Sequence, residues 1–192
     1  MKTCVFITGT NAVGKSALAW ELITRYGGVD RITNDVTYCV EGDICLAGAY
    51  GVTRYGGVDR ITNDKGSSCT SRLAEVVEEG LRYSDTIFCE GSFLHSFGLN
   101  LSNALFKAER QLVVNLYCDP QTIWQRLTAR SNGKYGSGKR RFDLIIKKQK
   151  QTMLSARKWQ SIGVPVLQIN TAEVSIDEEV RMIQQALNME ER

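Results

Sequence analysis

A glycine-rich loop near the N-terminus limits the chain to a small set of folds. Residues 9–16 read GTNAVGKS and match the pattern G-x-x-x-x-G-K-[ST], between the apolar run TCVFIT and the helix-like segment ALAWELI. A strand that turns tightly into a helix in this way points backbone N–H groups and the positive end of the helix at a phosphate group. In this pattern Lys15 reaches the β- and γ-phosphates, and the Ser16 hydroxyl binds Mg²⁺. The predicted nucleoside-triphosphate site consists of Gly9, Thr10, Asn11, Ala12, Val13, Gly14, Lys15, Ser16 and Ala17.

Strand-like and helix-like segments alternate along the rest of the 192 residues. This order predicts a single α/β domain with a doubly wound, parallel, five-stranded sheet. Strands are expected at 3–8, 29–33, 85–89, 111–117 and 164–169, and helices at 15–25, 68–83, 100–110, 120–130, 141–160 and 175–189.

An insertion interrupts this alternation over residues 37–66. Two alternating apolar runs flank Glu41-Gly42-Asp43, a pattern typical of a β-hairpin. The 12-residue segment TRYGGVDRITND occurs at 24–35 and again, unchanged, at 53–64. Because tertiary context overrides local preference, we expect the two copies to take different structures. The first would end a helix and form the second strand, and the second would form a glycine-rich loop.

Composition excludes several classes of protein. The chain is 43% hydrophobic and 23% charged, as soluble globular proteins are, and no window approaches the roughly 18 apolar residues of a membrane span. The six cysteines show no C-x-x-C pair and no metal-ligand spacing with the single histidine, His95. They therefore predict buried thiols of a reducing cytoplasm. The N-K-x-D and D-x-x-G patterns of GTPases are absent.

Positive charge is concentrated between residues 126 and 158. This segment holds eleven Lys or Arg and one acid, Asp143, so the rest of a chain of net charge +3 must carry −7. Such a segment usually faces an anion, either nucleotide phosphates or a nucleic-acid backbone. Three glycines and a cluster of cations over 131–141 predict a mobile basic lid. A merely solvated basic surface is the alternative.

The phosphate loop, the order of elements and the basic segment together resemble the P-loop kinases of nucleosides, nucleotides and related small molecules. The resemblance covers nearly the whole chain in element order, but only the phosphate loop is a specific motif. It implies ATP and Mg²⁺ as cofactors. In that superfamily the second strand commonly ends in an acid that meets the acceptor hydroxyl, here Asp35 of ITND, unless Asn34-Asp35 only closes a turn. Glu90, after the run DTIFC, resembles the acid of a Walker B strand, either near Mg²⁺ or as an alternative base.

The same resemblance extends to two arginines and one asparagine. The segment DPQTIWQRLTAR resembles the kinase helix that leads into the lid, and its Arg126 and Arg130 lie four residues apart on one helical face. In related kinases such arginines stack on adenine or contact the transferring phosphoryl group. Asn170 follows the last strand, where such kinases border the adenine, although it equally fits an N-cap of the next helix.

The insertion GAYGVTRYGGVDR resembles phage P-loop kinases that phosphorylate 5-hydroxymethyluracil within DNA, and ITND-x-x-Y resembles polynucleotide 5′-hydroxyl kinases. This resemblance implies DNA containing a modified pyrimidine as the partner. The implied acceptor site comprises Asp35, Tyr55, Gly56, Gly57, Asp59, Arg60, Glu90, Arg140, Arg141, Lys147 and Lys150. Because residues 26–31 repeat the same letters, the copy that contacts substrate stays open. A kinase of free nucleosides, nucleotides or polynucleotide 5′ ends is one alternative, and a nucleic-acid-binding P-loop ATPase is another.

Overall fold

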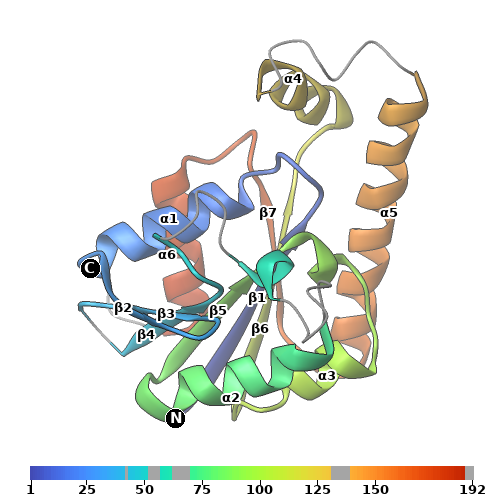
Figure 1. Cartoon of the computed structure of the whole chain (residues 1–192). Helices are drawn as coiled ribbons and strands as arrows, with labels where there is room; N and C mark the ends of the chain where they lie inside the picture. The colour runs from blue at the N-terminus through green and yellow to red at the C-terminus, as the bar shows by residue number, and fades with distance from the viewer. Residues whose placement is uncertain (42, 52–56, 62–69, 131–138, 189–192) are drawn as a thin grey trace.

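Helices cover both faces of one central sheet (Figure 1). The computed structural model describes residues 1–41, 43–51, 57–61, 70–130 and 139–188. The strands are β1 (Thr3–Gly9), β2 (Val29–Thr33), β3 (Val36–Cys39), β4 (Ile44–Ala47), β5 (Thr86–Glu90), β6 (Arg110–Tyr117) and β7 (Val166–Asn170). The α-helices are α1 (Lys15–Arg25), α2 (Leu73–Tyr83), α3 (Leu99–Leu105), α4 (Pro120–Arg130), α5 (Lys139–Ser161) and α6 (Ile176–Ala186). Three short 3-10 helices are η1 (Val58–Arg60), η2 (Thr70–Arg72) and η3 (Ser92–His95).

The strands lie in the order β2-β3-β4-β5-β1-β6-β7. The five strands from β4 to β7 in that order pair in parallel, whereas β2 and β3 add an antiparallel edge. The predicted α/β fold with a doubly wound, five-stranded parallel sheet is therefore confirmed. In such sheets ligands bind beyond the carboxyl ends of the strands, where the strand order reverses.

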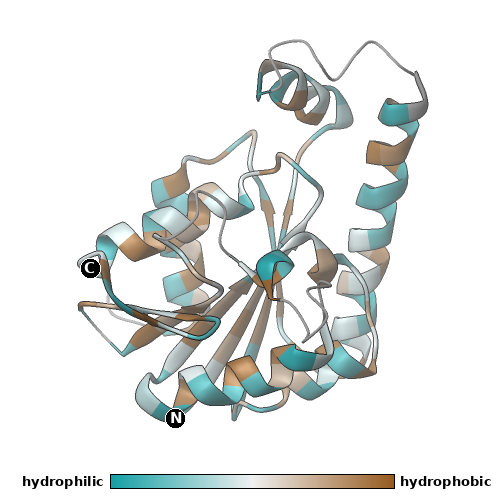
Figure 2. Ribbon diagram, in the orientation of Figure 1, coloured by the Kyte–Doolittle hydropathy of each residue, from teal (hydrophilic) through white to brown (hydrophobic). Residues whose placement is uncertain are grey.

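Burial on both faces explains why β1 is apolar without a break. All seven of its residues are buried, as expected for a parallel strand covered by helices on both sides. Val5 and Ile7 pack in the core beneath α1 and α6, and Cys4 and Phe6 pack in the core beneath α2 and α3. Figure 2 shows the central strands mainly in apolar colours and many polar colours along the helices.

The second parallel strand is not the one expected from the sequence. Residues 29–33 do form a strand, but β2 pairs only with β3, in antiparallel fashion, at the edge of the sheet. The parallel neighbour of β5 is β4, which is the second arm of the predicted hairpin. The reason is burial: all four residues of β4 are buried, whereas β2 has no fully buried residue and fits an edge.

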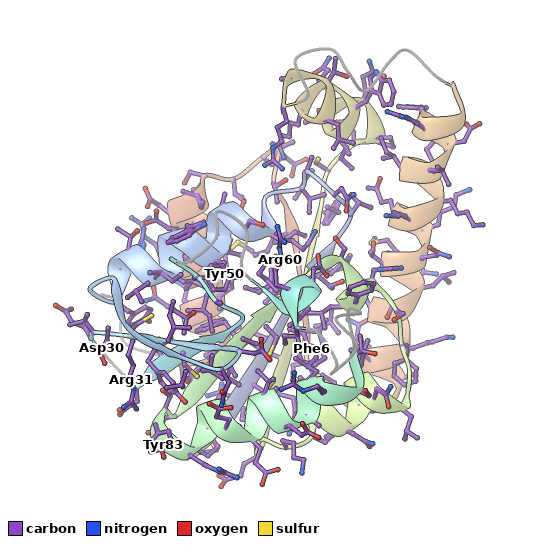
Figure 3. All side chains as sticks on the ribbon, in the orientation of Figure 1. Phe6, Asp30, Arg31, Tyr50, Arg60 and Tyr83 are labelled. Carbon is purple, nitrogen blue, oxygen red and sulfur yellow. The ribbon has the colours of Figure 1, made fainter. Side chains whose placement is uncertain are left out.

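The two copies of the repeated segment take different structures, as predicted. In the first copy Val29, Asp30 and Arg31 begin the edge strand β2. In the second copy the same letters, Val58 to Arg60, form the helical turn η1. Figure 3 shows Asp30 and Arg31 at the outer edge of the sheet and Arg60 near the centre of the molecule. The same local sequence thus forms an edge strand in the first copy and a helical turn in the second.

Two findings on the described part of the chain concern membrane spans and cysteines. No helix there is both long and apolar enough to cross a membrane. Five cysteines among the described residues are buried free thiols: Cys4, Cys39, Cys45, Cys89 and Cys118. Burial raises the pKa of Cys39 to about 11, so that this thiol stays protonated and unreactive.

Candidate active site

The phosphate loop joins β1 to α1 through backbone conformations that favour glycine. Gly9 has φ +144°, and a Cβ there would lie 2.5 Å from the carbonyl oxygen of Leu116. Gly14 has φ +112° and precedes the first residue of α1, Lys15. Non-glycine residues rarely adopt such angles, so the two glycines of the motif are required by the turn itself. The loop therefore presents backbone N–H groups at the start of α1, as a phosphate site requires.

Lys15 lies inside this loop rather than in solvent. Its ammonium donates hydrogen bonds to the carbonyl oxygens of Gly9, at 3.1 Å, and Thr10, at 2.8 Å, and the residue is only 7% exposed. Burial lowers the pKa of Lys15, while the carboxylate of Glu90 opposes that effect and the cations Lys148 and Arg130 add to it. A buried ammonium held by two carbonyls is positioned to bind the oxygens of a β- or γ-phosphate.

Glu90 lies at the end of β5, beside the phosphate loop. Its Oε1 is 3.5 Å from the Ser16 hydroxyl and accepts a hydrogen bond of 2.9 Å from the hydroxyl of Tyr50. Glu90 is 5% exposed, and burial raises the pKa of its carboxyl, although the nearby Lys15 ammonium opposes the shift. The Ser16–Glu90 pair predicted from the sequence is therefore brought together.

The oxygen atoms of Ser16 and Glu90 fit a magnesium ion. Mg²⁺ prefers oxygen ligands and usually takes only one or two from the protein, with substrate phosphates and water completing its shell. Within the described residues no cluster of three or more His, Cys, Asp or Glu side chains could hold a metal on its own. A hydroxyl and a carboxylate at the mouth of a phosphate loop suit a metal that arrives with a nucleotide.

Tyr50 is a site residue that the sequence analysis missed. It follows β4, is fully buried, and packs its ring edge-on against Trp20 at 5.6 Å. Burial raises the pKa of Tyr50 well above its usual value, so its hydroxyl stays protonated and can donate to Glu90. Recognising β4 as the second parallel strand would have pointed to Tyr50, because the residues that follow such strands lie at the ligand edge.

The second copy of the repeat supplies one wall of the site. Asp59 accepts hydrogen bonds from the backbone N–H groups of Ser92, at 2.9 Å, and Phe93, at 3.2 Å. Gly57 has φ +83°, and a Cβ there would lie 2.4 Å from Oε1 of Glu90, so only glycine allows this approach. Tyr55 and Gly56, which the resemblance implied in the same wall, lie outside the described residues.

These groups surround one open pocket of about 420 Å³ at the carboxyl edge of the sheet. Its volume falls within the roughly 300–1,000 Å³ that small-molecule sites occupy. The pocket combines acids and cations at the mouth of the phosphate loop. Its lining consists of Asn11, Ala12, Lys15, Ser16, Asp59, Arg60, Glu90, Ser92, Leu127 and Arg130.

Asp35 lies elsewhere along the same edge of the sheet. It occupies the turn between β2 and β3, does not line this pocket, and forms an ion pair of 3.4 Å with Arg72. The edge position of β2 explains this placement, because β3 and β4 lie between β2 and the Glu90 strand. Asp59, from the second copy of the repeat, is the aspartate that the structure places beside Glu90 and Arg60.

The two arginines of α4 have different surroundings. Arg126 donates to the hydroxyl and to the backbone carbonyl of Thr171, each at 3.0 Å, beside Asn170 at the end of β7. The Asn170 side chain accepts a hydrogen bond of 3.2 Å from the N–H of Ala172. Arg130 instead lines the phosphate pocket. Of these two arginines, Arg130 is the one that shares a pocket with Lys15.

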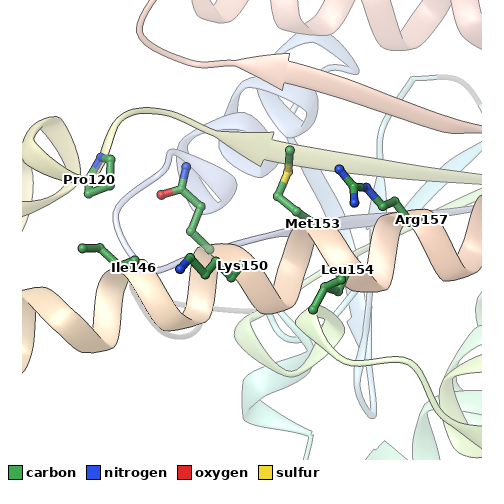
Figure 4. Close-up of a pocket in the computed structure, with 7 residues that line it drawn as sticks. Pro120, Ile146, Lys150, Met153, Leu154 and Arg157 are labelled. Carbon is green, nitrogen blue, oxygen red and sulfur yellow. The ribbon is translucent and has the colours of Figure 1, made fainter.

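The cations of α5 divide between the two flanks of the helix. Arg141 and Lys148 line a pocket of about 220 Å³ together with Thr10 and Asn11 of the phosphate loop, so that Lys148, one of the cations of the basic segment 126–158, faces that loop. Lys150 lines a separate apolar groove of about 530 Å³ on the other flank, beside Met153 and Arg157 (Figure 4). Lys147 is exposed. The side chain of Arg140 and most of the predicted lid, 131–138, lie outside the described residues.

The fold and the phosphate loop define a class: the chain has the fold of the P-loop kinases. No protein-family model matches it, and no curated protein matches it in sequence. Solved structures of other proteins share this fold over nearly the whole chain. One is the YorR protein from Bacillus subtilis in complex with phosphorylated GDP, 17% identical, with a TM-score of 0.56 over 96% of this chain and 95% of that chain.

Two further structures are kinases of small molecules. Shikimate kinase from Acinetobacter baumannii in complex with shikimate is 14% identical, with a TM-score of 0.54 over 98% of this chain and 94% of that chain. Deoxyadenosine kinase from M. mycoides with bound dCTP is 14% identical, with a TM-score of 0.52 over 96% of this chain and 98% of that chain. At such identities the likeness establishes the fold, and the chemistry has to be argued from the site.

Proposed function

We propose that the chain is an ATP- and Mg²⁺-dependent kinase that phosphorylates a primary hydroxyl. The observation that carries the proposal is the buried Lys15 ammonium inside the phosphate loop, with Ser16 3.5 Å from Glu90 at the mouth of the same pocket. Phosphoryl transfer needs little covalent chemistry from a protein. It needs a fixed triphosphate, charge stabilisation and an oriented acceptor.

Residues of the pocket would meet each of these three needs. The loop N–H groups and Lys15 would hold the triphosphate, and Arg130 would balance the charge that develops on the moving phosphoryl group. Ser16 and Glu90 would hold Mg²⁺, which supplies neutralisation of phosphate charge when it is bound. Arg126 and Asn170, at the end of β7, would border the base of the nucleotide.

Asp59 is our proposal for the residue that accepts the proton of the acceptor hydroxyl. The acceptor oxygen attacks the γ-phosphorus while the bond to the β–γ bridging oxygen breaks, so that ADP leaves and the hydroxyl proton passes to the carboxylate. Asp59 lines the pocket, and its oxygens are held by two backbone N–H groups. Asp35, the residue implied by family resemblance, remains the competing candidate from the turn before β3.

We further propose that the acceptor is the 5-hydroxymethyl group of hydroxymethyluracil in DNA. Support comes from charge, because residues 126–158 carry ten more positive than negative charges, beyond what one triphosphate needs. Arg141 and Lys148 face the phosphate loop, while Lys147 and Lys150 would contact the DNA backbone from exposed positions. The insertion that includes Gly57 and Arg60 supports the same acceptor through its resemblance to phage DNA kinases.

The test is an acceptor panel with γ-labelled ATP. Hydroxymethyluracil DNA, the matching nucleoside, free nucleotides, 5′-hydroxyl oligonucleotides and water are compared, with Lys15→Ala as the inactive control. Label transferred to hydroxymethyluracil DNA supports the full proposal. Label found only in a free nucleoside, or only in a 5′ end, leaves a kinase with another acceptor. Label released only as phosphate identifies an ATPase and overturns the kinase assignment.

A further inference from the structure

A second pocket lies at the end of η3 opposite to the end that lines the phosphate pocket. It has a volume of about 210 Å³ and lies between the end of η3, with the chain that follows it, and the C-terminal half of α5. Because this volume is below the roughly 300 Å³ at which small-molecule sites begin, it suits a single ring rather than a whole nucleotide. Its lining consists of His95, Ser96, Phe97, Gln151, Leu154, Ser155 and Lys158.

An aromatic ring forms part of this pocket. Phe97 is 36% exposed, and its ring packs edge-on against the buried Trp159 with a centroid distance of 4.7 Å. The ammonium of Lys158 lies 6.0 Å from the centroid of Phe97. A partly exposed ring that is fixed from behind is a stacking surface for a flat heterocycle, and such stacking does not require a particular base.

A buried hydroxyl in the same pocket lacks a partner. Ser155 is 4% exposed, and its Oγ has no hydrogen-bond partner among the described residues. Buried polar groups in proteins are nearly always hydrogen-bonded, so an exception in a pocket wall points to a polar ligand. Gln151 lies one helical turn before Ser155 and adds an amide that both donates and accepts. A ring with carbonyl and N–H groups on its edge matches these two side chains.

The helix η3 links this pocket to the phosphate pocket. Ser92, its first residue, lines the phosphate pocket, and His95, its last, lines the second pocket and contacts the Ser92 carbonyl through Nδ1. One 3-10 turn spans only about 6 Å. On α5, Lys148 lines the 220 Å³ pocket beside Thr10 and Asn11 of the phosphate loop, and it lies three residues before Gln151 of the second pocket. A ring bound near Phe97 would therefore lie within reach of the phosphoryl donor.

We propose that this second pocket binds the pyrimidine ring of the acceptor. The ring stacks on Phe97, its edge hydrogen-bonds to Ser155 and Gln151, and its hydroxymethyl group extends toward Asp59. This inference rests on the proposed kinase function and specifies a base-recognition site for it. The pocket is formed jointly by α5 and by the chain that follows the Glu90 strand.

The test measures acceptor binding separately from catalysis. Isothermal titration follows binding of 5-hydroxymethyl-2′-deoxyuridine and of an oligonucleotide containing that base, without ATP, to the wild type, Phe97→Leu and Ser155→Ala. Phe97→Leu removes one stacking contact and should weaken the binding of both ligands by about tenfold. Phe106→Leu is the matched control, because Phe106 is exposed but does not line this pocket. The Michaelis constant for ATP should stay unchanged in all variants.

The outcomes separate the two proposals. If the wild type phosphorylates the base and both variants bind it as tightly as the wild type, the pocket assignment is overturned and the kinase function stands. If the variants lose base binding but the wild type transfers phosphate to no acceptor, the base site stands and the kinase function falls. Because Phe97 packs on Trp159, Ser155→Ala is the variant that keeps the test valid should Phe97→Leu unfold. An effect on the oligonucleotide alone identifies DNA as the source of the base.

Discussion

The hydroxyl of Tyr50 donates a 2.9 Å hydrogen bond to Oε1 of Glu90, and both residues are buried. The bond joins the segment after β4 to the end of β5, which are neighbouring parallel strands. The Thr37 side chain holds the same segment, because its hydroxyl accepts a hydrogen bond of 2.8 Å from the backbone N–H of Tyr50. The carboxylate beside Ser16 is thus oriented by a residue of the insertion.

Tyr50→Phe tests this orientation. Removing a hydrogen bond to a buried carboxylate should cost about 1.5–3 kcal/mol of unfolding free energy. It should also raise the Mg²⁺ concentration needed for half-maximal activity, because the Glu90 carboxylate loses a donor that stabilises its charge. Denaturant unfolding and a magnesium titration of the rate measure both effects. Tyr83→Phe, at an exposed tyrosine, is the control. An unchanged magnesium requirement would show that Tyr50 only packs.

Lys15→Ala should abolish phosphoryl transfer and leave the fold intact. Within the described residues the ammonium hydrogen-bonds to two loop carbonyls, at 2.8 and 3.1 Å, so its loss removes no apolar core. Loss of one preorganised charge of this kind typically reduces turnover by about 10²–10³-fold or more. Turnover with γ-labelled ATP and a thermal melt are the measurements. A fully active Lys15→Ala enzyme would refute the phosphate-loop kinase assignment.

Asp59→Asn and Asp35→Asn distinguish the two candidates for the catalytic base. If Asp59 accepts the hydroxyl proton, Asp59→Asn should lower kcat by about 10²–10⁴-fold with little change in the Michaelis constant for ATP. Asp35→Asn should keep most of the activity, because Asp35 pairs with Arg72 away from the pocket. The opposite pattern would return the role to Asp35. A thermal melt of each variant checks that it is folded, since Asp59 also accepts hydrogen bonds from two backbone N–H groups.

Stability should depend on the titration of Glu179. Burial raises the pKa of this carboxyl to about 7, against the opposing charge of Arg126, and its Oε2 has no hydrogen-bond partner among the described residues. The folded state therefore holds the proton more tightly than the unfolded state. The unfolding free energy should fall as pH rises from about 4.5 to 7 and then level off, by about 1–2 kcal/mol after allowing for solvent screening.

Glu179→Gln should remove that pH dependence. Denaturant unfolding at pH 5 and pH 8 measures it for both proteins. The isosteric amide keeps the shape of the side chain and cannot ionise. Glu173, exposed in the turn before α6, supplies the control variant Glu173→Gln. If the pH dependence survives in Glu179→Gln, another group causes it.

Binding of a DNA acceptor should weaken steeply as salt rises. Contacts to about four phosphates of a single strand would give a log–log slope near −3, whereas a free nucleoside should show almost none. Replacing Lys147 and Lys150 together by alanine should weaken DNA and flatten its slope, with ATP binding nearly unchanged. The double variant Arg82→Ala/Lys107→Ala removes the same charge outside α5 and should leave the slope as it was. Equal slopes for all three proteins would place the DNA elsewhere.

Much of the nucleotide site could be predicted from the sequence, because its parts are contiguous in the chain. The motif at 9–16 follows one strand and begins one helix, so the positions of Lys15 and Ser16 follow from local geometry. Glu90 was predictable for a related reason: it ends an apolar run that could only be a buried strand. The parallel five-stranded sheet followed from the alternation of such runs with helical periodicity.

Long-range packing decided the acceptor side. Gly28–Ile32 and Gly57–Ile61 have the same five letters, GVDRI, so no local preference could separate them. The first copy is extended because it pairs with β3 at an open edge of the sheet. The second forms a helical turn because Gly57 packs against Glu90 and Val58 against Gly91. Sequence alone thus determined the phosphate loop. Contacts between distant segments decided which aspartate faces the pocket, because two identical segments fold differently when their surroundings differ.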